Sequence, residues 1–332
     1  MMFEVKASPE NLYWGYFDAE TKPVLTVPSG AEVMLHTLPA CFEEDVPPNS
    51  TLVTPDHRIA LDNLVPGGGD GKVVAGPVGP HVLTGPIFVE GAMPGDVLQV
   101  DILEATPRQD WGFCAILPLL GTLPEEFTNY ERMHVSIDRN RQMAKLPWGL
   151  EIALDPFFGI MGVAPPKEWG RIGTPEPRAF GGNMDNKDLR PGSTVYFPVF
   201  NEGALFSAGD GHGCQGHGEV CITALETALN GVFRLTVRKD MKLAQPFAET
   251  PDKLISMGFN SDLDEAARQS VREMIRLICE RTNLDRNQAY MLCSLVADLH
   301  VTQLVDINKG VHAILDKRHL VNALARREEY SL

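Results

Sequence analysis

Residues 84–103 read TGPIFVEGAMPGDVLQVDIL, and this stretch indicates the fold class most clearly. A short apolar run is followed by Pro94-Gly95 and then by apolar residues at every second position from Leu98 to Ile102. Alternation with a period of two is typical of a half-buried strand, and Gly95 can supply the positive φ of a type II turn. The stretch therefore predicts two strands joined by a tight turn.

A second pair of alternating runs surrounds Asn230-Gly231. Alternation continues through residues 219–224, and it appears again in VFRLTVRK at 232–239. Asn-Gly between two such runs is typical of a hairpin with a type I′ turn. We therefore expect a hairpin here, with Glu219 at the beginning of its first strand and the Glu219 side chain directed toward the preceding loop.

Helical periodicity begins only near residue 261. The run SDLDEAARQSVREMIRLICERTN (261–283) carries an apolar stripe at helical spacing, with Ser261 as the expected N-cap. Asp285 and Gln288 have the spacing of a capping box, which predicts a second helix. Residues 301–307 (VTQLVDI) then predict a strand that returns the chain to a sheet.

The composition agrees with a mainly β globular chain. Gly (30 residues) and Pro (25 residues) are abundant and favour turns over long helices. The 332 residues suit about two structural units. We expect a β-rich catalytic region at 1–245 and a smaller, mixed α+β lobe with two helices at 246–332.

Charge and hydropathy exclude several classes of partner. The formal net charge of −15 would repel phosphate backbones and anionic lipids, so neither nucleic acid nor a membrane is an expected partner. No apolar run approaches the ~20 residues that span a bilayer, and the first residues lack the pattern of a signal peptide. We therefore expect a cytoplasmic protein. The six cysteines form no CxxC pair, which argues against a disulfide framework.

The segment from 209 to 218 is half glycine and carries the residues suited to chemistry. Asp210 and His212 lie within this segment, Glu219 follows it directly, and Asp185 lies upstream in GGNMDN. Glycine loses more conformational entropy than other residues when it is ordered, and a plain surface loop does not need so many glycines. One imidazole among several carboxylates suits Zn²⁺, or a harder cation if water completes the coordination shell.

Other interpretations of the same segment remain open. Cys214 and His217 are further candidate ligands, although a packed thiol is the more common state of a cysteine such as Cys214. His212 could equally be a histidine that is hydrogen-bonded beneath the loop.

Four stretches of the chain resemble the acetamidase/formamidase family. The resemblance covers roughly residues 83–315 and includes the phrase GDGHGCQGHGE. Its segments are GPIFVEGAMPGDVLQVDI (85–102), GGNMDNKDL (181–189), FPVFNEGALFSAGDGHGCQGHGEVCITALE (197–226) and LDRNQAYMLCSLVADLHVTQLVDINKGVHAIL (284–315). His217 departs from the acidic residue that is more usual between the two glycines of QGxGE in this family.

The resemblance implies a fold built on β-sandwich or jelly-roll-like units, metal dependence, and hydrolysis of short aliphatic amides such as acetamide or formamide. Carried over by position, the metal set comprises Asp185, Asp210, His212 and Glu219, with His81 as a further candidate. Zn²⁺ is the expected metal, with Ca²⁺ or Mn²⁺ as alternatives.

The expected chemistry is attack by metal-activated water, which yields a carboxylate and ammonia. Glu219 is the first candidate for the carboxylate that moves the proton, and Glu90 or Asp185 would take this role if Glu219 is a metal ligand. A rival mechanism uses Cys214 as a nucleophile beside His212 or His217.

Substrate, function class and assembly leave further alternatives. Phe180, Met184, Phe206 and Trp111 could wall a small apolar pocket, although such residues more often belong to the core. The chain could instead be a non-catalytic metal- or ligand-binding β protein, or a hydrolase of a related C–N bond in a carbamate or a cyclic amide. A homo-oligomer, dimeric or larger, is expected.

Overall fold

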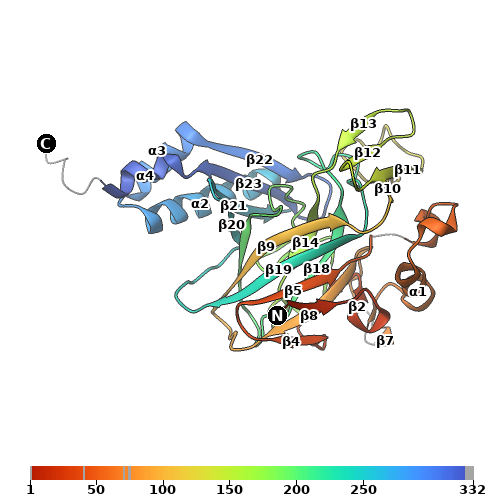
Figure 1. The fold of residues 1–332 in the computed structure, drawn as a ribbon. Coiled ribbons are helices and arrows are strands. Elements are labelled where there is room, and N and C mark those ends of the chain that lie inside the picture. Colours follow the sequence, from red (N-terminus) through yellow and green to blue (C-terminus); the bar gives the residue numbers. More distant parts are fainter. Residues whose placement is uncertain (1, 40–41, 70–71, 74–75, 326–332) are drawn as a thin grey trace, which may run out of the picture.

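The computed structural model describes residues 2–39, 42–69, 72–73 and 76–325, and Figure 1 shows them as a mainly β molecule. Two large sheets face each other, and most helical residues lie in the C-terminal third. The expected mainly β fold is confirmed. Within the described residues, none of the helices has the length and apolar character needed to cross a bilayer.

The larger sheet has nine strands, and all neighbouring strands are antiparallel except the parallel pair β1–β5. In spatial order they are β1 (Met2–Val5), β5 (Ala31–His36), β19 (Leu229–Arg238), β9 (Val97–Pro107), β17 (Thr194–Pro198), β20 (Phe247–Glu249), β21 (Lys253–Asn260), β23 (Lys309–Asp316) and β22 (Ala297–Gln303).

The second large sheet carries the glycine-rich segment. Its strands are β16 (Gly181–Asn183), β14 (Phe157–Gly162), β18 (Phe206–His212), β8 (Val82–Val89), β2 (Leu12–Trp14), β6 (Gly68–Gly69) and β7 (Lys72–Val73), and β4 (Leu25–Val27) pairs with β8. A smaller sheet comprises β10 (Trp111–Ile116), β11 (Glu131–Asp138), β12 (Met143–Lys145) and β13 (Glu151–Ala153), and β3 (Tyr16–Phe17) pairs with β15 (Ile172–Gly173). The α-helices are α1 (Pro55–Asn63), α2 (Leu263–Arg281), α3 (Arg286–Val296) and α4 (Arg318–Ala325).

Apolar side chains from both large sheets form one core. Phe233 of β19 lies between Phe158 of β14 and Phe206 of β18, with ring centroids 5.2 Å and 5.4 Å away. All three side chains are fully buried, and burial of a large side chain of this kind contributes about 1.5–3 kcal/mol. The core therefore holds β14 and β18, the strands next to the candidate site, firmly against the larger sheet.

The expectation of two strands in residues 84–103 is confirmed, but they do not form a hairpin. β8 belongs to the second sheet and β9 to the nine-stranded sheet, so the turn between them carries the chain from one layer to the other. Gly95 has φ of 88° in this turn, as expected.

The hairpin expected around Asn230-Gly231 is wrong. Both residues lie inside β19, paired with β5 and β9, and residues 220–224 form no strand. A Cβ on Gly231 would lie 2.5 Å from Cζ of Phe158, so glycine is needed here for close packing between the sheets and not for a turn. Glu219 consequently lies in a turn, with φ of 45°, and not at the beginning of a strand.

The C-terminal third has the expected helices α2 and α3 with small shifts at their ends. The N-cap of α2 is Asp262 rather than Ser261, and its side chain accepts a hydrogen bond from the backbone N–H of Glu265. The capping box of Asp285 and Gln288 is confirmed at α3. The strand expected at 301–307 forms earlier, as β22.

The strands on either side of residue 245 share one sheet. Strands β20 to β23 continue the nine-stranded sheet, while α2 packs on β21 and β23. The division of the chain at residue 245 stays a prediction.

Candidate metal centre

Strand β18 positions two of the expected site residues. Asp210 and His212 are two positions apart on this strand, so their side chains point to the same face of the sheet. His212 lies opposite Glu226 in an isolated β-bridge, which brings a second carboxylate to the same place. Glu226 directly precedes the segment that leads into β19, and nothing in the sequence pattern distinguished it from other acidic residues.

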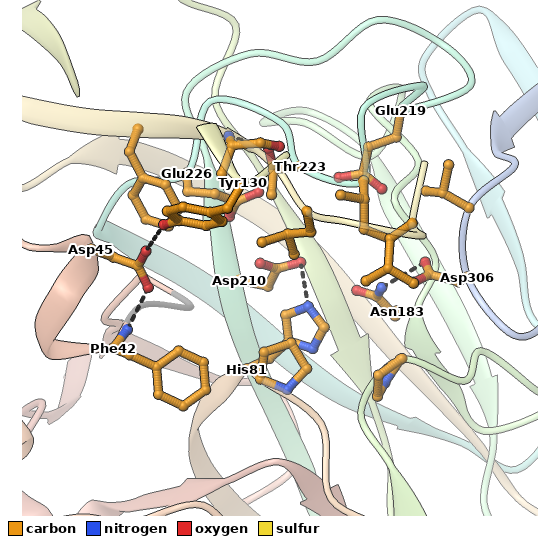
Figure 2. Close-up of a pocket in the computed structure, with 18 of the residues that line it drawn as sticks. Phe42, Asp45, His81, Tyr130, Asn183, Asp210, Glu219, Thr223, Glu226 and Asp306 are labelled. Atoms are coloured by element: carbon orange, nitrogen blue, oxygen red, sulfur yellow. Dashed lines mark hydrogen bonds and ion pairs between the residues drawn. The ribbon is translucent and has the colours of Figure 1, made fainter. Parts of the chain in front are cut away.

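These three side chains converge on one point, which we call the Asp210 site (Asp210, His212 and Glu226). Nε2 of His212 lies 3.2 Å from Oδ2 of Asp210 and 3.4 Å from Oε2 of Glu226. All three residues are buried. Nε2 of His81 approaches Oδ2 of Asp210 to 3.9 Å, and Figure 2 shows His81 directed toward Asp210.

Hydrogen bonds fix the orientation of the His212 ring. Oε1 of Gln215 lies 2.8 Å from Nδ1 of His212, while Nε2 of Gln215 donates to the backbone carbonyls of Asp185 and Thr302. Because the amide nitrogen of Gln215 is thus occupied, its oxygen accepts a hydrogen bond from Nδ1–H of His212. In the neutral form of His212, which is the form that binds a metal, the lone pair therefore lies on Nε2 and faces Asp210 and Glu226.

A second set of carboxylates lies beside the Asp210 site, and we call it the Asp185 group (Asp185, Glu219 and Asp306). Ligand atoms of Asp185, Glu219 and His212 all lie within 4.8 Å of one another. Nδ2 of Asn183 donates to Oδ2 of Asp306 at 2.8 Å. Sequence reasoning missed Asp306 because it fell in the strand expected at 301–307.

Three of the expected site residues have unusual backbone conformations. Asp185, Asp210 and Glu219 have φ of 45°, 56° and 45°, in the left-handed region that non-glycine residues rarely adopt. Such conformations each cost of order 1–3 kcal/mol and concentrate at functional sites. The surrounding structure therefore holds these three carboxylates in place against local backbone strain.

The carboxylates differ in their electrostatic surroundings. Burial and the neighbouring negative charges of Glu219, Asp306 and Asp210 raise the pKa of Asp185 well above its usual range. Burial and nearby carboxylates likewise raise the pKa of Glu219, and they raise the pKa of Asp306 to about 7.

The residues of the Asp210 site respond differently. Burial favours neutral forms, yet the imidazoles of His212 and His81 hold the pKa of Asp210 below its usual range. The carboxylates of Glu226 and Asp210 outweigh burial and raise the pKa of His212. The pKa of Glu226 is itself raised, chiefly by burial.

The donor atoms fit a divalent cation. Several buried atoms have no hydrogen-bond partner within the described part of the chain, namely both carboxylate oxygens of Asp185, Oδ1 of Asp210, Nε2 of His212 and Oε2 of Glu226. A bound cation would neutralise so many buried acidic groups and satisfy these atoms.

Gly159 of β14 keeps open a space between these donors. A Cβ at this position would come closer than 3.0 Å to Oδ2 of Asp210, Oδ1 of Asp185 and Cε1 of His212. The carbonyl of Gly159 also accepts the backbone N–H groups of Met184 and Asp185, at 3.0 Å and 3.2 Å. Only a residue without a side chain leaves room here.

A cavity of about 570 Å³ opens at this cluster. Its polar wall includes His81, Asp210, Glu219, Glu226 and Asp306, which Figure 2 shows around one space. Its apolar wall is formed mainly by Phe42, Pro80, Phe113, Ala115, Leu117, Leu120, Pro175, Ile222, Val305 and Ile307. A few polar groups in a mostly apolar cavity are typical of small-molecule sites.

The aromatic and Met residues considered as pocket walls belong to the core. Phe180, Met184 and Phe206 are fully buried between the sheets, and Trp111, the first residue of β10, packs in a separate apolar cluster. None of these four residues is among those that line the cavity. The interpretation as core residues is therefore confirmed.

The structure does not bring Glu90 to the site. Glu90 is exposed just after β8, whereas His81 lies just before the same strand, roughly 30 Å away at the rise of an extended chain. Glu90 is not among the residues that line the cavity, so this placement does not support the predicted role of Glu90 in proton transfer.

Cys214 and His217 lie near the cluster without joining it. Burial raises the pKa of the Cys214 thiol, which disfavours a nucleophilic thiolate. His217 approaches Asp188 and two further histidines instead. Among the described residues, Cys114, Cys214, Cys221, Cys279 and Cys293 are free thiols, and Cys41 lies outside the described residues.

Comparisons with known proteins agree with the sequence resemblance. Residues 78–172 and 170–316 match the family model described as the Acetamidase/Formamidase family. A formamidase of Methylophilus methylotrophus is 29% identical over 252 residues, which cover 57% of this chain and 61% of the relative. An acetamidase of Mycolicibacterium smegmatis is 30% identical over 198 residues, which cover 42% of this chain and 49% of the relative. The chain thus matches about half to three-fifths of the length of these curated relatives.

The fold comparison extends over nearly the whole chain. The crystal structure of an acetamidase from Bacillus halodurans superposes with a TM-score of 0.81 at 28% sequence identity. The match covers 97% of this chain and 99% of that chain. Since the family model spans well over half of the sequence and the fold agrees throughout, the chain belongs to the acetamidase/formamidase family.

Proposed function

We propose that this protein hydrolyses small amides to a carboxylate and ammonia, with a divalent cation held by Asp210, His212 and Glu226. Family membership supports the reaction class. One observation carries the proposal for the site. The buried Nε2 of His212, oriented by Gln215, faces two carboxylates at the wall of a cavity and has no hydrogen-bond partner within the described residues.

Zn²⁺ is the cation that we propose, because imidazole nitrogen and carboxylate oxygen are ligands that it accepts. Ca²⁺ and Mn²⁺ are the alternatives for a set so rich in carboxylates. At such a site a divalent cation polarises a carbonyl oxygen and lowers the pKa of water. Asp185 and His81 are the further candidate ligands.

Glu219 is our candidate for proton transfer. It lines the cavity together with Asp210, from a turn on another part of the wall, and it is buried. There it can take a proton from the attacking water and deliver it to the departing nitrogen. Asp185 is fully buried and does not line the cavity, so it is the second candidate for proton transfer.

Neighbouring groups of the wall can orient the substrate. Oδ1 of Asn183 is buried and has no hydrogen-bond partner among the described residues, while Nδ2 of Asn183 is engaged with Asp306. We infer that Oδ1 of Asn183 accepts an N–H of the amide. Phe42, Phe113 and Leu117 would then pack against the acyl group.

The test is release of ammonia from formamide, acetamide and longer aliphatic amides by the purified protein. We expect activity that is lost on chelation, returns with Zn²⁺ and is unchanged by Cys214→Ala. If Cys214→Ala abolishes activity while the metal content is intact, the thiol mechanism replaces this one. Failure to release ammonia from any linear amide would favour a non-catalytic binding protein. If the protein hydrolyses only a carbamate or a cyclic amide, its substrate contains a related C–N bond and is not a linear amide.

We also propose that the chain forms a homo-oligomer, dimeric or larger. Strand β22 lies at the edge of the nine-stranded sheet, and unpaired sheet edges are commonly covered by association. Large apolar side chains are exposed in β22 and the neighbouring α3, namely Tyr290, Met291, Leu295 and Leu299. Sedimentation equilibrium of the purified protein tests this, and a monomer at all concentrations would contradict it.

A further inference from the structure

A second group of potential ligands lies outside the Asp210 site, and we call it the histidine cluster (Asp188, His217, His300 and His312). Each residue offers one ligand atom, and these four atoms lie within 4.8 Å of one another. The residues come from four separate segments. Asp188 follows β16, His217 lies in the loop after β18, His300 is in β22 and His312 is in β23.

The sheet itself places two of the histidines together. His300 and His312 are direct partners in the antiparallel pair β22–β23, so their side chains leave the same face of the sheet. Nε2 of His312 lies 3.0 Å from Oδ2 of Asp188, and Nε2 of His217 lies 3.7 Å from the same oxygen. Ligand atoms of a tetrahedral Zn²⁺ site with bonds of 2.0–2.1 Å are about 3.3 Å apart, which falls between these two distances.

Hydrogen bonding accounts for only part of this arrangement, namely the contact at 3.0 Å between Nε2 of His312 and Oδ2 of Asp188. The three imidazole rings have centroids 4.7 Å to 5.3 Å apart, but they are tilted by 50° to 82° and are not stacked. His312 is fully buried, and its Nδ1 has no hydrogen-bond partner in the described portion of the chain. Nδ1 of His217 and Nδ1 of His300 are likewise buried without a partner there. Among the described residues, Asp188 is the carboxylate that has a ligand atom within 4.8 Å of a ring nitrogen of each of the three histidines.

We propose that the histidine cluster is a second metal site, distinct from the Asp210 site, which binds Zn²⁺ or a similar divalent cation through Asp188, His217, His300 and His312. Three imidazoles and one carboxylate complete a four-coordinate shell of the nitrogen and oxygen ligands that Zn²⁺ accepts. The two sites share no residue.

The position of this second site suggests a structural role. Asp188 is three residues after Asp185, and His217 is two residues before Glu219. A cation in the histidine cluster would therefore tie the two segments that carry Asp185 and Glu219 to strands β22 and β23. A site with four protein ligands has no open position for substrate, as is typical of structural zinc sites.

The test is a zinc titration of metal-free protein against a chromophoric chelator, for the wild type, His300→Gln and His217→Asn. These are the partly exposed histidines of the cluster, and circular dichroism checks that each variant folds. We expect each variant to bind one zinc ion fewer than the wild type, or to bind that ion more than about 100-fold more weakly. A loss of this size exceeds the loss of about 10–100-fold that is typical when a residue outside the coordination shell is changed. The control is His319→Gln in α4, which changes a histidine outside both sites and should leave binding unchanged.

Wild-type zinc stoichiometry and affinity in both His300→Gln and His217→Asn would overturn the proposal. The variant Glu226→Gln separates the two sites. Glu226→Gln should weaken zinc binding at the Asp210 site, but zinc bound at the histidine cluster should still raise the melting temperature of this variant. In His300→Gln, the increase in melting temperature that comes from the histidine cluster should be lost. Failure of either site is therefore visible independently of the other.

Discussion

Nδ1 of His212 lies 2.8 Å from Oε1 of Gln215, and this contact decides which ring nitrogen faces Asp210 and Glu226. The same glutamine donates to the backbone carbonyls of Asp185 and Thr302. Gln215 therefore connects the orientation of one candidate ligand with the backbone position of another.

Replacement of Gln215 tests this connection. In Gln215→Leu, Nδ1 of His212 loses its acceptor, so the ring and its tautomer are no longer fixed. We expect zinc affinity at the Asp210 site to fall about 10–100-fold, as is typical when an outer-shell partner is removed. Isothermal titration calorimetry measures this, with Gln245→Leu in the loop before β20 as the control. Equal affinities for Gln215→Leu and the wild type would contradict the role assigned to Gln215.

Gly159→Ala tests whether the space between the donors is needed. The added methyl group would occupy the position close to Asp210, Asp185 and His212, so we expect loss of zinc binding at the Asp210 site. Overpacking of this kind also destabilises a fold by about 1–3 kcal/mol. Metal analysis measures the loss of zinc, and urea denaturation measures the loss of stability.

Gly216→Ala is the matched control for this change. Gly216 lies in the glycine-rich segment 209–218, and a Cβ there would meet no atom within 4 Å. We expect wild-type metal content and stability. If Gly159→Ala retains zinc as well as Gly216→Ala does, the cation is not held between these residues.

Glu219→Gln tests the proposed proton transfer. The amide keeps the shape of the side chain but cannot accept a proton, so kcat should fall by about 10²–10⁴-fold while the metal content stays close to that of the wild type. Glu202→Gln, at an exposed residue of the loop before β18, should have wild-type kcat. Loss of metal from Glu219→Gln would instead make Glu219 a ligand and pass the proton role to Asp185.

His57 predicts a pH dependence of stability that is separate from the metal sites. The His57 side chain of α1 is buried and stacks on Trp111, and burial lowers the pKa of His57 to about 4. Because the unfolded chain has a histidine pKa of about 6.5, it takes up the proton first as the pH falls. The folded state therefore loses stability as the pH falls below about 6.5. The loss in the free energy of unfolding reaches about 3 kcal/mol near pH 4.

The variant His57→Phe keeps a ring against Trp111 but cannot be protonated. Between pH 7 and pH 4.5 its free energy of unfolding should therefore fall less steeply than that of the wild type. Urea denaturation with a chelator present measures the difference without a contribution from metal release. Parallel pH profiles for the two proteins would mean that His57 does not titrate in this way.

The sequence was sufficient to identify part of the candidate site. Asp185, Asp210, His212 and Glu219 lie in short, unusual segments, and the structure brings all four close together. Glu226 and Asp306 could not be found in this way. They reach the cluster only through tertiary structure, Glu226 by the bridge to His212 and Asp306 through the loop after β22.

Local patterns were less reliable where tertiary packing decides the conformation. Alternation identified β9 and most of β19, because each strand has one face on the core. The expectation of a hairpin turn at Asn230-Gly231 was wrong, because glycine is required at position 231 for close packing against Phe158 and not for a turn. The pairing of distant strands, such as β17 with β9, depends on contacts that no short stretch encodes.

The measurement that tests the central claim most directly is anomalous X-ray diffraction at the zinc edge from crystals of the zinc-loaded protein. The account predicts a zinc peak between Nε2 of His212, Oδ2 of Asp210 and Oε2 of Glu226. Full zinc occupancy elsewhere with no peak among these three atoms would contradict it.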